Sequence, residues 1–108
     1  MSAWEPRGAA MTEMFWILDG HEVKSVSDVE IWAATGGVKH VDDTDIGDAR
    51  ISTVFLGIDH SHGHGPPLLF ETMIFGGVHD QYQVRCSTWE QAEAQHATAC
   101  AMVRKYIN

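Results

Sequence analysis

Alternation of apolar and polar residues predicts a β-sheet built from the middle of the chain. The clearest strand covers residues 50–58, where Ile51, Thr53 and Phe55 alternate with residues that point the other way. Both faces of this strand carry β-branched or aromatic side chains, which indicates a central position in the sheet. The other predicted strands cover residues 38–45, whose three aspartates are typical of a sheet edge, and residues 68–75 and 81–86.

Helical spacing of apolar residues predicts two helices, each opened by a capping box. Ser27 with Glu30 opens a short helix that Gly36-Gly37 ends. Ser87 with Glu90 opens a second helix that runs to the end of the chain. One face of this helix is rich in alanine and is expected to lie close against the sheet; it carries Trp89, Ala92, Ala99, Val103 and Ile107.

A β-hairpin is predicted where the patterned sequence begins. Asp19-Gly20 is a strong two-residue turn signal between residues 15–18 and 23–26. The whole pattern predicts an α+β fold: an antiparallel sheet of about four to six strands, a long C-terminal helix packed on one face and a short N-terminal helix. Residues 1–13 are expected to form a flexible lead-in, and residues 14–108 a single domain, because half of so short a chain would bury too little core.

The charge of the chain excludes several classes of partner. Fifteen acidic residues against seven lysines and arginines give a formal net charge of −8. Nucleic acids and anionic membrane surfaces are bound through clustered Lys and Arg, so neither is expected as a partner. Cys86 and Cys100 form no CxxC pair, and we expect two buried thiols in a reducing compartment.

Three stretches of the chain resemble a family of small, uncharacterised proteins encoded by tailed bacteriophages and prophages. They are Ile51–His60 (ISTVFLGIDH), Gly65–Gly77 (GPPLLFETMIFGG) and Ser87–Glu93 (STWEQAE), and Trp16–Gly20 fits as well. The resemblance implies a phage accessory protein that works in the cytoplasm of the bacterial host. By analogy it further implies a counter-defence role, either blocking a host protein or sequestering a nucleotide signal.

The loop between the two most apolar strands, residues 59–67, is the leading candidate for a binding site. Gly63 and Gly65 allow the backbone to approach a ligand, and Pro66 with Pro67 stiffens the return to the next strand. Loops held by a rigid sheet often carry binding groups. Because a strand and not a helix follows, the loop is not a P-loop.

Three histidines alternate in this loop, and their spacing also suits a metal site. In an extended segment His60, His62 and His64 would point the same way, as ligands of Zn, Ni or Cu do. Ordering a loop with two glycines costs entropy, so we expect no metal and no cofactor, and keep a metal-dependent hydrolase as an alternative. His60 beside Asp59 could serve acid–base chemistry, but we favour a turn capped by Asp59.

Further candidates lie on the neighbouring strands and on the C-terminal helix. Glu71 and Thr72 interrupt an apolar strand, so one of them must face inward or line a groove. Arg50 or Arg85 is available to pair with a buried glutamate, or to receive a phosphate or carboxylate of a ligand. Trp89 could stack on a base, although aromatic residues at such positions are more often part of the core.

These features favour a binder over an enzyme, and no catalytic residue is assigned. The leading hypothesis is a homo-oligomer that sequesters a small nucleotide-like ligand, because subunit interfaces supply the concavity that so small a domain lacks. The alternative is an acidic interaction protein that covers a basic surface of a host defence protein with Asp42, Asp43, Asp45 and Asp48. The predicted ligand-binding residues are Arg50, His60, His62, Gly63, Gly65, Pro66, Glu71, Thr72, Arg85 and Trp89.

Overall fold

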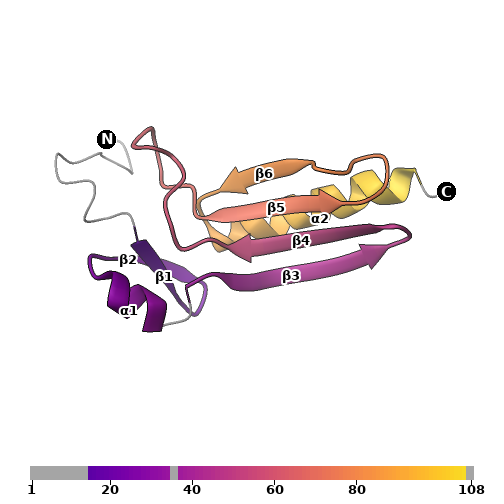
Figure 1. The fold of residues 1–108 in the computed structure, drawn as a ribbon. Helices are drawn as coiled ribbons and strands as arrows, with labels where there is room; N and C mark the ends of the chain where they lie inside the picture. Colours follow the sequence, from indigo (N-terminus) through magenta and orange to yellow (C-terminus); the bar gives the residue numbers. More distant parts are fainter. Residues whose placement is uncertain (1–14, 35–36, 107–108) are drawn as a thin grey trace.

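The computed structural model describes residues 15–34 and 37–106, which form two antiparallel sheets and two helices (Figure 1). The predicted α+β fold is confirmed. The small sheet is a hairpin of β1 (Phe15–Asp19) and β2 (Glu22–Val26), followed by α1 (Val29–Ala34). The main sheet has the order β3-β4-β5-β6, and its strands are β3 (Lys39–Ile46), β4 (Ala49–Phe55), β5 (Phe70–Phe75) and β6 (Gln83–Cys86).

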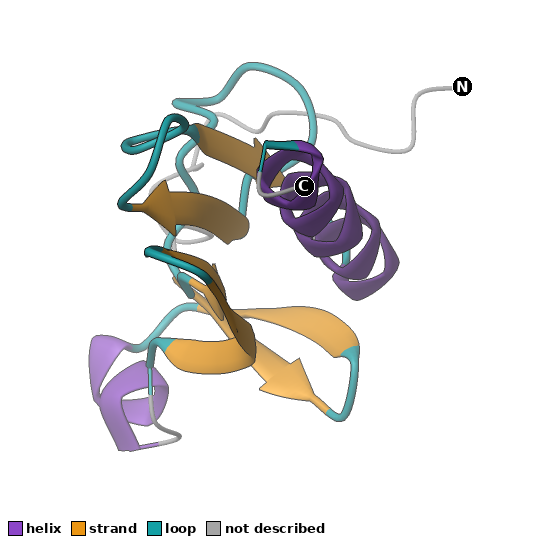
Figure 2. Ribbon diagram, turned by 90° about the vertical axis from the view of Figure 1, so that its right-hand side faces the viewer, coloured by secondary structure: helices purple, strands orange, loops and turns teal. Residues whose placement is uncertain are grey.

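The C-terminal helix, α2 (Trp89–Lys105), packs on one face of the main sheet, as predicted (Figure 2). It contacts all four strands of this sheet. Ala92 and Ala99 are fully buried, and their small side chains let the helix axis approach the strands closely. On β4, the alternate residues Ile51, Thr53 and Phe55 are fully buried beneath the helix, so the predicted alternation gives the correct face.

The core has two parts, one toward each end of α2. At the C-terminal end of the helix, Ile51 and Ile74 pack with Val103 and their neighbours. At its N-terminal end, Phe55 and Phe70 pack with Ala92 and their neighbours. The hairpin rests on this second part through three side chains, Trp16, Leu18 and Val23.

The predicted hairpin turn is wrong by one residue. Asp19 pairs with Glu22, so the two turn residues are Gly20 and His21 and not Asp19-Gly20. Gly20 has φ +64°, as the first central residue of a type II′ turn requires. Asp19 instead ends the strand and binds Lys24 on β2 at 2.6 Å.

Both helix starts lie one residue later than predicted. Thr88, and not Ser87, is the N-cap of α2: its hydroxyl accepts from the Gln91 N–H at 3.1 Å, and the Gln91 side chain accepts from the Thr88 N–H at 3.2 Å. The sequence contains two overlapping capping boxes here, and the pattern alone does not separate them. At α1 the Asp28 carboxylate accepts from the Glu30 N–H at 2.8 Å.

Several predictions fall on residues 1–14, 35–36 and 107–108, outside the described parts of the chain. These are the lead-in over residues 1–13, the contribution of Gly36 to the end of α1 and the place of Ile107 on the helix face. Between residues 15 and 106, apart from the gap at 35–36, no helix is long and apolar enough to cross a bilayer.

Candidate functional site

The loop with the histidines connects the paired strands β4 and β5 (Figure 1). Phe55 pairs with Phe70 at the end of the ladder, and backbone hydrogen bonds continue beyond it. The Leu56 N–H donates to the Leu69 carbonyl at 2.6 Å, and the His60 N–H donates to the Leu68 carbonyl at 3.0 Å. The predicted pairing of the two apolar strands is confirmed, and only residues 61–67 project beyond it.

One carboxylate joins the two ends of this projecting loop. Asp59 Oδ1 accepts from the Ser61 N–H at 2.7 Å and from the Leu68 N–H at 3.1 Å. The Ser61 hydroxyl in turn accepts from the Gly63 N–H at 3.3 Å. Asp59 therefore caps a turn, as favoured from the sequence, and braces the loop.

The tip of the loop is exposed to solvent. The exposed residues form one continuous run: His62, Gly63, His64, Gly65 and Pro66. His60 is half-buried at the base of the loop. Among the described residues, no group of three or more His, Cys, Asp or Glu side chains is close enough to hold a metal ion, so the three histidines do not converge.

Glu71 and Arg85 form an ion pair on the face of the sheet opposite α2. Arg85 Nε lies 3.0 Å from Glu71 Oε2, and the Gln83 amide donates to the same oxygen at 2.6 Å. The Glu71 side chain is 15% exposed and that of Arg85 is 35% exposed. Within the described chain, the Arg85 guanidinium donates only through Nε, so its two terminal nitrogens keep their hydrogen-bonding capacity.

An open groove runs beside Arg85, between the outer edge of β6 and the N-terminal part of α2. Its volume is about 420 Å³. The Gln95 amide donates to the Arg85 carbonyl at 3.4 Å and so links α2 to β6 within the groove. We call this the Arg85 groove; it is lined by Leu68, Arg85, Cys86, Ser87, Gln91, Ala94 and Gln95.

The structure does not bring the predicted site residues into one place. The loop, Glu71, Arg85 and Trp89 lie at the end of the sheet where β5 begins and β6 ends. Arg50 lies at the opposite end, opposite Phe75 on β5, with its Nε 3.0 Å from Asp45 Oδ1. Thr72 is fully buried beneath α2 and cannot meet a ligand at the surface.

One face of the Trp89 ring is occupied by another side chain of the protein. The His21 ring stacks on it, with centroids 3.9 Å apart and an interplanar angle of 8°. The Trp89 ring also meets the Phe70 ring edge-on, with centroids 6.4 Å apart. Trp89 lines a second open groove of about 410 Å³, together with residues 21–24. It therefore joins the hairpin to the helix, and a base would have to displace His21 to stack there.

A buried hydrogen-bond network centred on His96 of α2 was not predicted from the sequence. His96 is 4% exposed; its Nδ1 lies 2.7 Å from Thr53 Oγ1, and its Nε2 lies 2.9 Å from Thr44 Oγ1. The Thr53 hydroxyl also contacts that of Thr72 at 2.6 Å, and Asp42 lies 3.5 Å from Nε2. The helical spacing with Ala92 and Ala99 could have placed His96 on the buried face.

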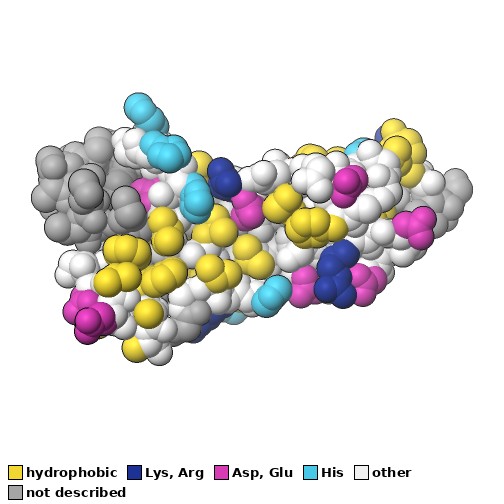
Figure 3. Space-filling view, in the orientation of Figure 1, with side chains coloured by type: hydrophobic (Ala, Val, Ile, Leu, Met, Phe, Trp, Pro, Cys, Tyr) yellow, Lys and Arg dark blue, Asp and Glu magenta, His cyan; other side chains and the backbone are white. Residues whose placement is uncertain are grey.

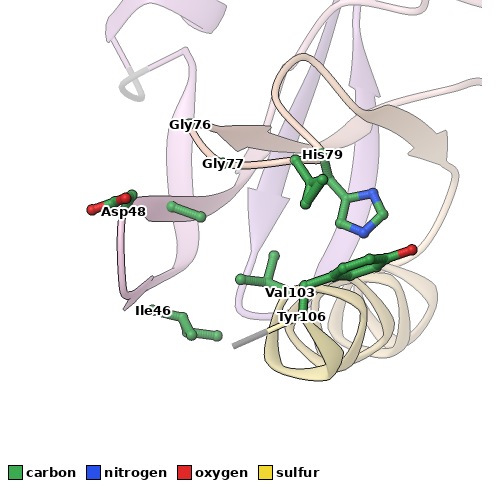
Figure 4. A pocket seen from close by; sticks show the side chains of 9 residues that line it. Ile46, Asp48, Gly76, Gly77, His79, Val103 and Tyr106 are labelled. Atoms are coloured by element: carbon green, nitrogen blue, oxygen red, sulfur yellow. The ribbon is translucent and has the colours of Figure 1, made fainter. Parts of the chain in front are cut away.

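A smaller cavity lies at the other end of α2, away from the predicted site residues (Figure 4). Its volume is about 140 Å³, and Ile46 and Val103 supply apolar walls. The ring of His79 meets that of Tyr106 edge to face, with centroids 5.1 Å apart. Ligand sites usually have volumes of about 300–1,000 Å³, so the Arg85 groove matches them better.

Cys86 and Cys100 are both free and buried, as predicted. Burial raises the pKa of the Cys86 thiol to about 11. Because the thiolate is the reactive form, the native protein is expected to react slowly with Ellman's reagent at pH 8 and faster as the pH approaches the raised pKa. Since the raised pKa belongs to the folded state, the stability that this thiol contributes is present below the unfolded pKa and is lost as the pH rises toward 11.

The measurement is a time course of the reaction with Ellman's reagent, in native buffer and in denaturant. The variant Cys100→Ala is used so that Cys86 is the thiol that reacts. Labelling of native Cys86 at pH 8 as fast as in denaturant would contradict its burial.

Comparisons with known proteins give no match for this chain among protein-family models, curated proteins or solved structures. Its function is therefore inferred from the arrangement of the described side chains.

Proposed function

We propose that this chain is a non-enzymatic binding protein that holds a small, anionic, nucleotide-like ligand in the Arg85 groove. The observation that carries the proposal is the hydrogen bonding of Arg85, a residue that lines this groove. Glu71 holds the guanidinium through Nε, and within the described chain the two terminal nitrogens have no acceptor. Such a fork matches two oxygens of a phosphate or carboxylate.

The lining of the groove suits the two parts of a nucleotide. Ser87 and Gln91 lie at the N-terminal end of α2, where the helix dipole favours negative charge, and Arg85 lines the same groove. Leu68 and Cys86 supply an apolar surface for a ring. The volume of about 420 Å³ falls within the usual range for small-molecule sites. A phosphate would therefore bind at Arg85 while the rest of the ligand lies along the groove.

The His96 network favours binding over catalysis. It is the set of described residues that most resembles a catalytic one, because a histidine contacts two hydroxyls. However, Thr53 is fully buried and His96 is 4% exposed, so a substrate has no access to either of them. The polar residues under α2 therefore have a structural role, because they satisfy one another's hydrogen bonds.

The biological setting of the proposal comes from the resemblance to phage-encoded proteins. In that setting the chain acts in the bacterial cytoplasm as a counter-defence protein and sequesters a nucleotide immune signal. The groove is open, and we propose that a second copy of the chain completes it in a homo-oligomer.

The proposal is tested by thermal shift with a panel of cyclic dinucleotides, cyclic ADP-ribose isomers and inorganic phosphate. We expect at least one nucleotide to raise the melting temperature of the wild-type protein, because a ligand that binds only the native state stabilises it. Arg85→Gln should abolish this shift, because the phosphate loses its charged fork.

Arg50→Gln is the matched control for Arg85→Gln. Arg50 also pairs with a carboxylate on the same sheet, but it lies at the opposite end. We expect the ligand shift to survive in this variant. An equal loss in both variants, or an unchanged shift in Arg85→Gln, would contradict a site at the Arg85 groove.

A further inference from the structure

The face of the main sheet opposite α2 is not covered by any described helix or strand (Figure 2). Alternation places Val54, Met73 and Phe75 on this face, because their neighbours in the strands are buried under α2. Phe75 is 42% exposed. Figure 3, which looks onto this face, shows hydrophobic side chains gathered mainly toward the hairpin end of the molecule, with a smaller group over β4 and β5. We call these three side chains the open-face stripe.

Acidic residues border the open-face stripe along β3. Asp43 and Asp45 pair in register with Ser52 and Arg50 and so point to the same face. Their side chains are 39% and 68% exposed, and Asp48 in the following turn is exposed as well. Among the described residues, Arg50 pairs with Asp45 and His40 contacts Asp43 at 3.2 Å, so three carboxylates meet one arginine and one histidine and this border is negative.

We infer that the open face docks an amphipathic helix of a basic partner protein. The apolar side of that helix would cover the open-face stripe, and its lysines and arginines would lie against Asp43, Asp45 and Asp48. The result is a sheet with a helix on each face, a common way to bury both sides of a sheet. This role does not require a ligand in the Arg85 groove, although the Arg85–Glu71 ion pair lies on the same face.

The charge of the chain selects this occupant over a second copy of the protein. Two chains meeting through their open faces would bring together two net charges of −8. Like charges facing each other across an interface oppose association, whereas a basic partner is attracted to the acidic border and steered toward it. The oligomer proposed for the Arg85 groove therefore uses another surface.

The experiment measures binding of a fluorescent helical peptide of leucine and lysine with leucine on one face. We expect Met73→Ser/Phe75→Ser to weaken its binding by about tenfold or more, because apolar anchors dominate such contacts. Asp43→Asn/Asp45→Asn should weaken binding by about threefold at low salt and reduce its salt dependence. Val78→Ser is the matched control, since Val78 is 70% exposed but lies in the loop after β5, beside the smaller cavity; this variant should bind as the wild type does.

Two peptides and one measurement of mass complete the test. A scrambled peptide of the same composition and a leucine–glutamate peptide should bind at least about tenfold more weakly. Equal binding of the scrambled peptide would overturn the proposal, as would equal losses in Val78→Ser and in Met73→Ser/Phe75→Ser. Light scattering that shows a dimer which Phe75→Ser dissociates would assign the face to a second copy and overturn it too. Ala94→Tyr fills part of the Arg85 groove with a neutral side chain from α2, on the other side of the sheet. It should weaken the ligand shift and leave peptide binding unchanged, so this proposal and the ligand site can fail separately.

Discussion

Replacing His96 with alanine is expected to lower the free energy of unfolding by about 3 kcal/mol. The imidazole contacts the hydroxyls of Thr53 and Thr44 with both of its nitrogens, in a site that is almost completely buried. Truncation removes these hydrogen bonds and leaves a cavity between α2 and the sheet. Thr53 keeps its contact with Thr72, so the loss is smaller than the complete loss of the polar network would be.

Urea unfolding followed by circular dichroism measures this effect. His96→Leu separates its two causes, because leucine fills much of the volume but forms no hydrogen bond; we expect it to lose about 1–2 kcal/mol. Thr98→Ala, at an exposed position of the same helix, should change stability by less than about 0.5 kcal/mol. If His96→Leu is as stable as the wild type, the network contributes nothing to folding.

Replacing Gly76 with alanine is the second change with a large expected effect, a loss of about 3–4 kcal/mol. Gly76 has φ +88°, a conformation that residues with a side chain rarely adopt, and its N–H donates to the Asp80 carboxylate at 2.7 Å. A Cβ at this position would collide with the backbone carbonyl oxygen of Asp48. A backbone atom cannot rotate away as the end of a side chain can, so the turns at this end of the sheet must separate.

Gly63→Ala is the matched control for this steric argument. Gly63 has φ +82°, close to that of Gly76, but an added Cβ would meet nothing within 4 Å. Its cost is therefore the backbone strain alone, about 1–2 kcal/mol. Denaturant unfolding of both variants gives the difference, and equal losses would show that the Asp48 carbonyl presents no obstacle.

The fold could be predicted from the sequence because the spacing of hydrophobic residues matches the side chains that are buried in the folded protein. The alternation in β4 gives the correct buried face, and the acidic residues of β3 correctly mark an edge strand. The errors are shifts of one residue where two signals overlap. Asp19-Gly20 competes with Gly20-His21 as the turn, and Ser87 competes with Thr88 as the cap. In each case the position of the turn or cap depends on where the preceding strand ends. Local composition does not fix the last residue of that strand.

The site was harder to predict because it depends on register. Arg50 and Arg85 look alike in the sequence, as outward-facing arginines on strands next to β5. The strand register shows that they lie at opposite ends of the sheet, because Arg85 pairs with Glu71 and Arg50 pairs with Phe75. His96 was overlooked because a lone histidine in an alanine-rich helix carries no motif. Its hydrogen-bond partners come from two strands, β3 and β4, that are distant from the helix in sequence.

The most direct test of the Arg85 groove is a map of amide chemical shifts by nuclear magnetic resonance, recorded with and without the nucleotide that gives the largest thermal shift. We predict that the perturbed amides cluster at residues 68, 85–87 and 91–95, which line the groove. Perturbations confined to residues 46–49, 76–79 and 103–106, around the smaller cavity, would contradict the account.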